Sequence, residues 1–309
     1  MSEAIISVLN SGIIPQNLNH TFISLIPKTK SPKKVSEFWP ISLTNVLYKL
    51  IAKVLANQLK LMLLNLISKT QSAFMSERLI TDNILIAYET LHFLKTKRTG
   101  KMGYMSMKLD MSKAYDQVEW VYLEKIMEKM GFNRKWIKLI VVCIRSVTYS
   151  IMINGQPHGF FTSTRGLRQG DPLSPYLFLL VTEGLHALFE EVKESGVIKG
   201  VSLCPAGRQV SHLLFADGCL VFCRAIVSES VKIQSILYKC EQALGQSINR
   251  CKTNLFFSSN TLPKVQEAIK TFLGIPAIQR YEHIWDCLPW LAEQTRSPLV
   301  SLRKGFRRN

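Results

Sequence analysis

The segment from Val210 to Phe222 places the strongest constraint on the fold, because it carries Asp217-Gly218 between two apolar runs. Asp-Gly in this setting is typical of a tight β-hairpin, since these residues accept the backbone angles that a two-residue turn requires. Asn154-Gly155, which follows the strand-like residues 149–153, predicts a second hairpin. The chain is therefore expected to contain antiparallel sheet.

Apolar residues at intervals of three and four predict several helices along the same chain. The predicted helices span residues 43–66, 82–95, 119–130 and 176–192. Met105, Met107 and Leu109 instead alternate with polar residues, which predicts a half-buried strand with Asp110 on its polar face. Helices mixed with antiparallel strands in this order indicate an α+β fold rather than a doubly wound parallel sheet.

The chain also carries a large excess of positive charge for a globular composition. Its 309 residues include 39 lysines and arginines against 22 acidic residues, a formal charge of +17. Such a charge favours a polyanionic partner. Nucleic acid is the first interpretation and an anionic membrane surface the second.

Three observations argue against a membrane or secreted protein. No stretch approaches the roughly 20 apolar residues that span a bilayer. Residues 1–15 contain Glu3 but no lysine or arginine, so they lack the basic start of a secretory signal. The seven cysteines are odd in number and scattered, which favours free thiols. We therefore expect a soluble intracellular protein, nuclear or cytoplasmic, that does not bind membranes.

Two aspartates stand where a metal ion could be held. Asp110 ends a predicted strand and Asp217 occupies the tip of a predicted hairpin. Mg²⁺ typically takes one or two carboxylates and completes its coordination with water and substrate phosphate. From position alone, the plainer alternatives are a strand-end polar residue and a turn former, and both stay open.

The residues around these aspartates resemble the motifs of reverse transcriptases. Residues 108–120 are similar to motif A, 165–175 to motif B, 212–218 to motif C and 245–253 to the motif D region. Upstream, residues 40–43 and 71–83 look like the finger motifs of the non-LTR (LINE-type) branch, especially its plant members. The matches occur in order over about residues 10–280, so the chain is identified as a member of that branch.

The resemblance implies a right-handed polymerase of fingers, palm and thumb. The reverse transcriptase domain is expected over residues 10–283, with fingers at about 10–100 and palm at about 101–260, the motif B helix being inserted in the palm. The implied reaction is attack of a DNA primer 3′-hydroxyl on a deoxynucleoside triphosphate, templated by RNA. It would use two Mg²⁺ (or Mn²⁺) ions.

The resemblance also implies roles for individual residues. Asp110 and Asp217 would be the catalytic, metal-binding carboxylates, and the main-chain carbonyl of Met111 a lesser metal ligand. Tyr115 resembles the aromatic residue that packs under the sugar and excludes a 2′-hydroxyl. Gln169 matches a residue placed beside the incoming nucleotide and template.

Several basic residues have implied or open roles. Arg78 and Lys252 match basic positions expected near the triphosphate. For Arg165 and Arg168, a solvated-loop role and a backbone-contact role are equally open. Asp171 is expected to fix the motif B loop.

Departures from the family pattern indicate a degenerate and truncated domain. Gly218 stands where the family has a second aspartate, and Trp39 where it commonly has arginine. Because glycine accepts positive φ, we expect the turn to survive while the chemistry suffers. A primer-grip turn and thumb are expected after residue 276, but the chain runs into an aberrant basic tail at 284–309, which is expected to be poorly ordered.

Three functions from different classes follow. The chain could be a reverse transcriptase, a catalytically silent palm that still binds primer–template, or a relic product that never folds stably. A group II intron maturase is a lesser rival, since no maturase extension is present. The histidines at 20, 92, 158, 186 and 283 show no metal-ligand spacing, so no further metal site is predicted.

Overall fold

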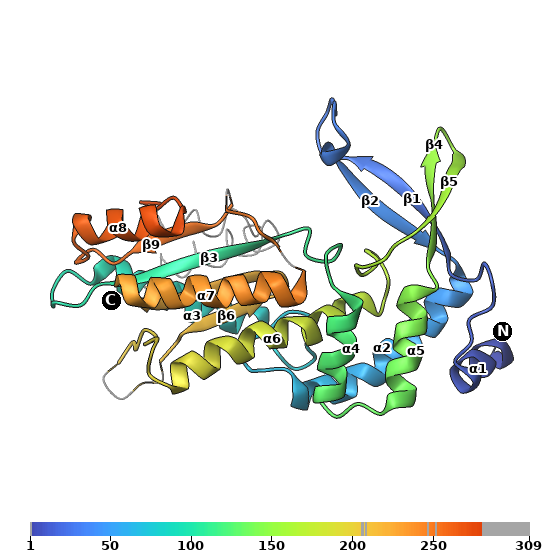
Figure 1. Cartoon of the computed structure of the whole chain (residues 1–309), viewed down its shortest axis with the longest axis horizontal. Coiled ribbons are helices and arrows are strands. Elements are labelled where there is room, and N and C mark those ends of the chain that lie inside the picture. Colours follow the sequence, from blue (N-terminus) through green and yellow to red (C-terminus); the bar gives the residue numbers. More distant parts are fainter. Residues whose placement is uncertain (1, 205–206, 208, 246, 251, 280–309) are drawn as a thin grey trace, which may run out of the picture.

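Two β-sheets organise the chain in a computed structural model, and helices surround one of them while the other stands apart (Figure 1). The structure describes residues 2–204, 207, 209–245, 247–250 and 252–279. The predicted basic tail at 284–309 lies outside the described residues. None of the described helices combines the length and the apolar character needed to cross a bilayer.

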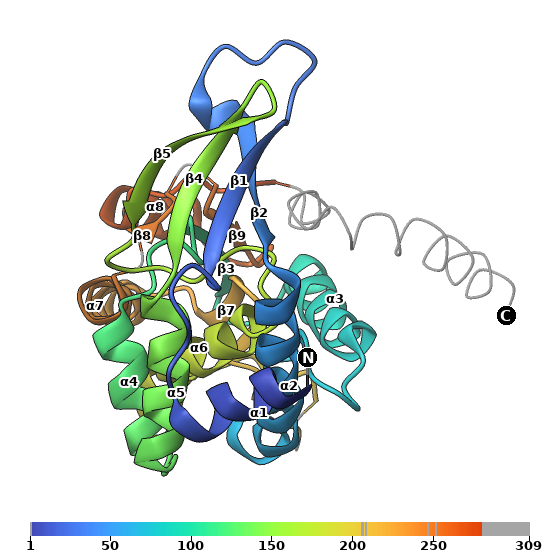
Figure 2. The same cartoon turned by 90° about the vertical axis from the view of Figure 1, so that its right-hand side faces the viewer.

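A four-stranded sheet projects from the helical part of the molecule (Figure 2). Its order is β2-β1-β4-β5, with β1 antiparallel to β2 and parallel to β4. The strands are β1 (His20–Pro27), β2 (Phe38–Thr44), β4 (Thr148–Ile153) and β5 (Gln156–Thr162), and a short 3₁₀ helix (Val35–Glu37) precedes β2. Asn154 and Gly155 join β4 to β5 with φ of 50° and 77°, which confirms the predicted second hairpin.

The other sheet is built around its long central strand, β3. Strands β6 and β7 extend it along one edge of β3, and β8 and β9 pair with successive parts of the other edge. The strands are β3 (Tyr104–Ser112), β6 (His212–Phe215), β7 (Gly218–Arg224), β8 (Ser247–Ile248) and β9 (Asn254–Phe257). The β6–β7 pair is the hairpin that Asp217-Gly218 predicts, so this part of the prediction is confirmed.

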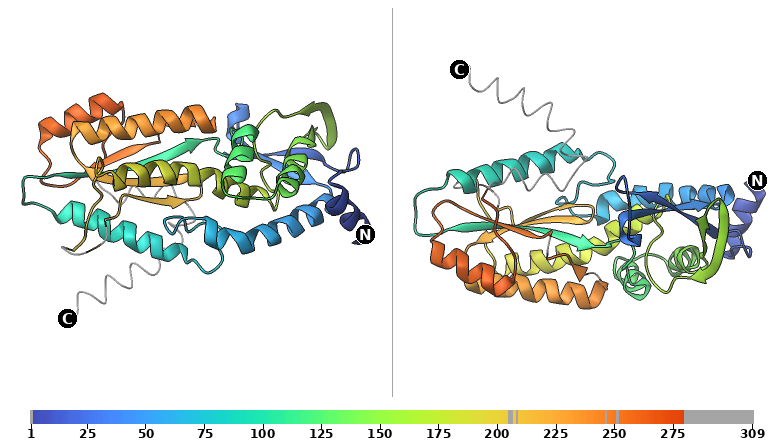
Figure 3. Two further views of the ribbon diagram at one scale, coloured as in Figure 1. Left: turned by 60° about the horizontal axis from the view of Figure 1, so that its bottom comes forward. Right: turned by 90° about the horizontal axis from the view of Figure 1, so that it is seen from above.

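Helices cover both faces of this second sheet. The helices of the described chain are α1 (Ser2–Ser11), α2 (Val46–Leu66), α3 (Ile80–Thr96), α4 (Trp120–Lys129), α5 (Arg134–Arg145), α6 (Ser174–Glu194), α7 (Val227–Leu244) and α8 (Pro263–Leu273). In Figure 3, α3 lies on one side of the sheet, and α6 and α7 lie on the other. The α+β class predicted from the sequence is confirmed.

The two faces of β3 are both buried, and here the prediction of a half-buried strand is wrong. Met105, Met107 and Leu109 join the main core with α6 and α7. On the opposite face, Ser106 and Lys108 are only 0% and 4% exposed, because a second apolar cluster from α3, β6 and β7 covers them. The alternation of apolar and polar residues therefore does not mark a solvent-facing side.

The predicted helix at 43–66 begins three residues later, at Val46. Residues up to Thr44 pair with β1, and the side chain of Asn45 accepts a hydrogen bond from the Leu47 N–H at 2.9 Å. This side-chain cap satisfies one of the free N–H groups of the first helical turn. The boundary is set by capping, which apolar periodicity alone does not show.

Candidate active site at the β3 end and the β6–β7 turn

The strand register brings the two predicted catalytic aspartates together. Asp110, near the end of β3, is the direct partner of Gly218, the first residue of β7. Asp217 precedes Gly218 in the two-residue turn that leaves β6. Although Asp110 and Asp217 are 107 positions apart in sequence, the sheet makes them neighbours at one edge.

A contact from the segment before α3 fixes this turn. Ala216 takes the strained positive φ of 53°, and its N–H donates to the side-chain oxygen of Gln71 at 3.1 Å. The N–H of Leu214 donates to the Thr70 carbonyl at 2.9 Å. The turn is present as expected, but Gly218 lies in the extended backbone of β7, so tolerance of positive φ at this glycine is not the reason. The turn depends on Ala216 and Gln71 rather than on Gly218.

The charge of Asp217 is influenced by one neighbouring carboxylate, Asp110, and by two lysines, Lys252 and Lys108. The pKa of Asp217 is raised, first because surrounding protein atoms displace water and then because Asp110 is nearby, although Lys252 and Lys108 act in the opposite direction. The Nζ of Lys252 lies 4.0 Å from the Asp110 Oδ2. Two acidic groups that disfavour each other's charge are suited to share a cation, since a cation relieves their repulsion.

Main-chain geometry adds an oxygen to these carboxylates. The Asp110 carbonyl accepts a hydrogen bond from the Asn249 N–H at 2.9 Å, on the β8 side of the strand. Because successive carbonyls of a strand point to opposite sides, the Met111 carbonyl points to the β7 side, where Asp217 lies. The donor set is then two carboxylates and one carbonyl, which are the hard oxygen ligands that Mg²⁺ and Mn²⁺ accept. The residues present therefore fit the divalent ion that the resemblance implies.

Position 218 faces Asp110 directly. Residues that pair across antiparallel strands project from the same face, with Cβ atoms roughly 5 Å apart. A carboxylate at position 218 would therefore stand beside Asp110, whereas Gly218 supplies no charge there. The side chain at position 218 therefore determines how much negative charge lies beside Asp110.

Tyr115 lies next to the same turn. Its ring stacks on Phe178 of α6, with ring centroids 4.8 Å apart and planes at 12°. Its carbonyl accepts a hydrogen bond from the Leu167 N–H at 2.8 Å, which ties motif A to the motif B loop. Burial and then the nearby charge of Asp217 raise the pKa of the phenol, so the ring stays neutral. Tyr115 is thus a rigid aromatic surface beside the aspartates.

Gln169 lies on the exposed surface of the motif B loop. It lines a cleft of about 290 Å³ between this loop and the four-stranded sheet, together with Pro40, Ser42, Asp116 and Tyr149. The cleft lies between this sheet and the segment that follows β3. Gln169 is therefore accessible to a molecule that enters between the two.

The two arginines of motif B, whose roles the sequence left open, differ in burial and in their partners. Arg168 is buried, donates to Thr21 Oγ1 at 2.7 Å and to Asn19 Oδ1 at 2.5 Å, and pairs with Asp171 at 3.3 Å. Arg165 is exposed and lies 3.4 Å from the Glu119 carboxylate. Arg168 therefore holds the loop to the β1 region, and Asp171 fixes the loop as predicted.

Arg78 has partners other than a phosphate in this structure. Its guanidinium donates to the carbonyls of Ile67, Ser68 and Gln71, at 2.7 Å for Ile67 and 2.8 Å for Gln71. These bonds cap the end of α2 and shape the segment that carries Gln71. A contact with the triphosphate stays a prediction, and the structural role of Arg78 is to support the turn through Gln71.

Trp39 lies in β2, away from the aspartates, and 51% of its surface is exposed. The Lys28 ammonium lies 4.4 Å from its ring centroid, a cation–π contact. An indole cannot donate the paired hydrogen bonds that an arginine offers to a phosphate. Trp39 therefore offers an exposed aromatic face and no such phosphate contact from the four-stranded sheet.

The sequence assigns no role to Gln71 or to Lys108. Gln71 lies within the finger motif at 71–83, but its contact with Ala216 spans 145 positions and leaves no local signal. Lys108 is two residues before Asp110 in β3, so the alternation of the strand could have placed it on the same face as Asp110. Its Nζ is buried and has no hydrogen-bond partner among the described residues.

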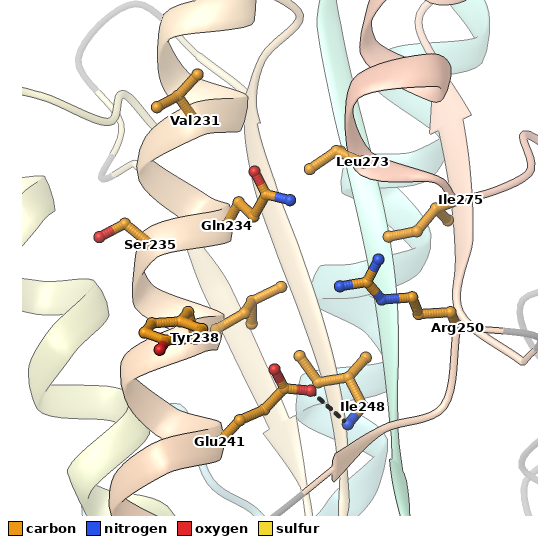
Figure 4. Close-up of a pocket in the computed structure, with 10 residues that line it drawn as sticks. Val231, Gln234, Ser235, Tyr238, Glu241, Ile248, Arg250, Leu273 and Ile275 are labelled. Carbon is orange, nitrogen blue, oxygen red and sulfur yellow. Dashed lines mark hydrogen bonds between the residues drawn. The ribbon is translucent and has the colours of Figure 1, made fainter.

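A separate pocket lies behind the site, between α7 and α8 (Figure 4). It has a volume of about 370 Å³ and is lined mainly by apolar residues such as Leu237, Leu273 and Ile275. On its wall, the Glu241 carboxylate accepts a hydrogen bond from the Ile248 N–H at 3.0 Å. This bond ties β8 to α7, and neither Asp110 nor Asp217 lines the pocket.

Comparisons with known proteins agree on one family. The family model of reverse transcriptase (RNA-dependent DNA polymerase) matches residues 26–277. The transposon TX1 uncharacterized 149 kDa protein of Xenopus laevis is 29% identical over 188 residues, covering 61% of this chain and 14% of that protein. A retrovirus-related Pol polyprotein from type-1 retrotransposable element R2 of Popillia japonica is 25% identical over 211 residues, covering 68% of this chain and 28% of that protein. The chain thus spans less than a third of either relative.

A solved structure shows the same fold. The apo telomerase from Candida tropicalis, truncated from its C-terminal domain, has a TM-score of 0.54 at 18% identity. The match covers 83% of this chain and 54% of that chain. The α+β architecture of fingers and palm that the sequence predicts is thereby shown.

Proposed function

Because this chain belongs to the reverse transcriptase (RNA-dependent DNA polymerase) family, we propose that its site is built for RNA-templated transfer of a deoxynucleotide to a DNA primer. The observation that carries the proposal is the β3–β7 register, which sets Asp110 beside the turn that holds Asp217. The matched relatives from R2 elements favour a non-LTR retrotransposon origin. The finger motifs at 40–43 and 71–83 favour a plant-type member.

The aspartates and the Met111 carbonyl would hold Mg²⁺ or Mn²⁺. When bound, such ions lower the pKa of the primer 3′-hydroxyl and neutralise charge on the phosphates. Asp110 and Asp217 supply the negative charge that this binding needs. Lys252, which lies 4.0 Å from Asp110, is placed to pair with a phosphate oxygen of the triphosphate.

The remaining predicted residues would position the substrates. Tyr115, held rigid by Phe178, would pack against the sugar and leave no room for a 2′-hydroxyl. Gln169 would contact the nucleotide or template from the cleft beside the four-stranded sheet. The surplus of lysine and arginine would bind the RNA and DNA backbones. We place the domain at residues 10–283 and its site of action inside the cell.

We propose that Gly218 impairs this chemistry. A carboxylate at 218 would stand opposite Asp110, so its absence weakens the negative field that holds the ions. Removing even an outer-shell partner of a metal typically costs about 10–100-fold in affinity or activity. The second candidate function, a silent palm that still binds primer–template, rests on this one position.

Primer extension separates the two functions. The purified chain is given an RNA template, an annealed DNA primer and deoxynucleotides with Mg²⁺ or Mn²⁺. We expect slow extension, roughly 10–100-fold faster after Gly218→Asp. Gly218→Asn, which has nearly the same shape without the charge, should not rescue, and Asp110→Asn should abolish extension in either background.

The rescue by Gly218→Asp should also have a particular kinetic pattern. Gly218→Asp should raise the rate constant more than it lowers the apparent KM for the nucleotide, because the added charge acts mainly in the transition state. Equal rescue by Gly218→Asn would show that the charge is irrelevant. No extension by either the wild-type or the Gly218→Asp chain, with primer–template binding intact, would favour the silent palm.

A further inference from the structure

A cluster of two histidines and a glutamate lies away from the catalytic turn, between α6 and the start of β6. His186 and Glu190 are four residues apart on α6, so they share one face of the helix. His212 is the first residue of β6 and is buried against them. One ligand atom from each of these side chains lies within 4.8 Å of the others.

We propose that this cluster is a binding site for a divalent transition-metal ion, with Zn²⁺ as the best match. Two imidazole nitrogens and one carboxylate oxygen are a common protein ligand set for Zn²⁺, with water in the fourth position. Imidazole ligands favour Zn²⁺ over Mg²⁺, which prefers oxygen ligands. The sequence shows no metal-ligand spacing around His186, because its neighbour His212 comes from another element.

The nitrogens are already arranged to bind an ion. The His186 Nδ1 and the His212 Nε2 point at each other at 2.7 Å. Tetrahedral coordination at about 2.0–2.1 Å from each nitrogen would hold them a little over 3 Å apart, so a small rotation of the rings suffices. No helix or strand has to move.

The tautomers need little change. The His212 Nδ1 lies 3.0 Å from the Ser211 Oγ, and if it donates its proton there, its Nε2 carries a free lone pair. In the metal-free protein, the His186 Nδ1 then donates a hydrogen bond to the His212 Nε2. To become a metal ligand, His186 must carry that proton on its own Nε2 instead. Both rings stay neutral throughout. The Ser211 contact is the kind of outer hydrogen bond that orients a metal-binding histidine.

One nearby charge opposes the site. The Lys193 Nζ lies 2.9 Å from both oxygens of Glu190. An ion would compete with this ammonium for the carboxylate, so removal of Lys193 should tighten binding. This effect has the opposite sign from that of losing a ligand, which makes it a sharp test.

A bound ion would join two parts of the palm. His186 and Glu190 belong to the helix that follows motif B, and His212 opens the strand that leads to the Asp217 turn. The ion would therefore stabilise the folded palm without touching the reacting groups. The inference does not depend on the proposed polymerase activity.

The test uses the full chain without an affinity tag, freed of metal by chelation. Binding of Zn²⁺ is measured by competition with a chromophoric chelator, and Co²⁺ serves as a spectroscopic probe. We expect one equivalent of Zn²⁺, visible Co²⁺ bands typical of tetrahedral nitrogen and oxygen ligands, and no sulfur-to-cobalt charge transfer. Saturating Mg²⁺ should not displace the ion.

Matched variants locate the site. The pair His186→Gln and Glu190→Gln should weaken binding by at least about 100-fold, the upper range for loss of an outer partner alone. The pair His158→Gln and Glu191→Gln, both exposed, should leave it unchanged. Ser211→Ala should cost about 10-fold, Lys193→Gln should tighten binding, and Asp110→Asn should have no effect.

Zn²⁺ binding by the wild-type chain tests the proposal without any variant. Absence of stoichiometric Zn²⁺ binding by the wild-type chain would overturn the proposal and leave a hydrogen-bonded histidine pair packed on Phe189. Equal binding by the site variant and its matched control would also overturn it. Far-ultraviolet circular dichroism of each variant confirms that a loss of binding is not a loss of fold.

Discussion

At the residue scale, the two arginines of the motif B loop differ in their surroundings although they are three positions apart. Arg168 is enclosed by Asn19, Thr21 and Asp171, and its guanidinium lies 4.3 Å from the Tyr48 ring centroid. Arg165 is exposed and pairs with the half-buried Glu119. A buried charged group that loses its partner is not solvated by water, which costs free energy, whereas an exposed charged group is solvated when its partner is removed.

Replacing Arg168 should therefore lower the free energy of unfolding far more than replacing Arg165. We expect Arg168→Met to lower the free energy of unfolding by about 3–5 kcal/mol, because Asp171 stays buried without its cation. Arg165→Met should change it by less than about 1 kcal/mol. Urea titration measures both, and equal losses would mean that the Arg168–Asp171 pair does not hold the loop.

The same residues show what a sequence can and cannot predict at this scale. Strand-end and turn positions alone left plainer roles open for Asp110 and Asp217, and they were predicted as site residues because the residues around them resemble reverse transcriptase motifs. The partners of Arg168 lie 147 and 149 positions away, and no local pattern records such a contact. His186 and His212 are a second example, since each appears isolated until α6 packs on β6.

At the element scale, the junction between motif A and motif B depends on one close approach. Gly166 has φ of 91°, and its N–H donates to the Val118 carbonyl at 2.8 Å. A Cβ at this position would lie 2.7 Å from the Asp116 carbonyl oxygen. The loop that carries Gln169 can therefore lie against the segment after β3 only if residue 166 has no side chain.

Gly166→Ala should destabilise the protein and displace this loop. We expect a loss of roughly 2–4 kcal/mol, from backbone strain together with the clash. Gly196→Ala is the matched control, because Gly196 has a similar φ of 70° but no heavy atom within 4 Å of its Cβ direction. It should cost only about 1–2 kcal/mol of backbone strain. Equal thermal unfolding temperatures for the two variants would contradict the close approach.

Helix α6 carries a buried acid that makes stability depend on pH. Burial raises the pKa of Glu183 from 4.5 to about 7, against the smaller opposing effects of Ser68 and Arg78. Between these values the folded chain holds more protons than the unfolded chain, so this group makes the free energy of unfolding fall as pH rises. Above pH 7 the loss from Glu183 is complete.

Glu183→Gln should remove this dependence. The variant should be more stable than the wild type above pH 7, by up to roughly 3 kcal/mol, and should lose less stability between about pH 4.5 and pH 7. Urea titrations across this range measure it. Glu191→Gln, an exposed change on the same helix, is the control, and indistinguishable pH slopes for both variants would refute the role of Glu183.

Elements with strong periodicity were predicted well, and those that depend on distant pairing were not. The helices α2, α3, α4 and α6 and the two hairpins were predicted near their observed bounds. Strand β1 was not, because its burial does not alternate and its partner β4 lies about 130 residues away. A parallel pair of this kind leaves no turn signal in the sequence.

At the scale of the whole molecule, the four-stranded sheet stands away from the helices and ends in a basic loop (Figures 1 and 2). This loop joins β1 to β2 and includes Lys30, Lys33 and Lys34, all exposed. Residues of this sheet line a cleft together with Asp116, which follows the end of β3 that carries Asp110. A duplex held at the aspartates would run past the sheet, so the lysines of the loop are candidates to contact its phosphates.

The charge of the whole chain should make binding of an RNA–DNA hybrid strongly dependent on salt. Each phosphate that a lysine neutralises releases counterions and adds up to about 0.9 to the slope of log affinity against log salt. Replacing Lys30, Lys33 and Lys34 by glutamine should therefore weaken binding and reduce that slope for each lysine that contacts a phosphate. The matched control replaces Lys125, Lys129 and Lys138, which are exposed on α4 and α5, and it makes the same change in net charge. Fluorescence anisotropy from about 50 to 200 mM salt measures the slopes. If the two triple variants lost slope equally, the loop would have no special contact, and a flat slope for the wild type would contradict the prediction of a polyanionic partner.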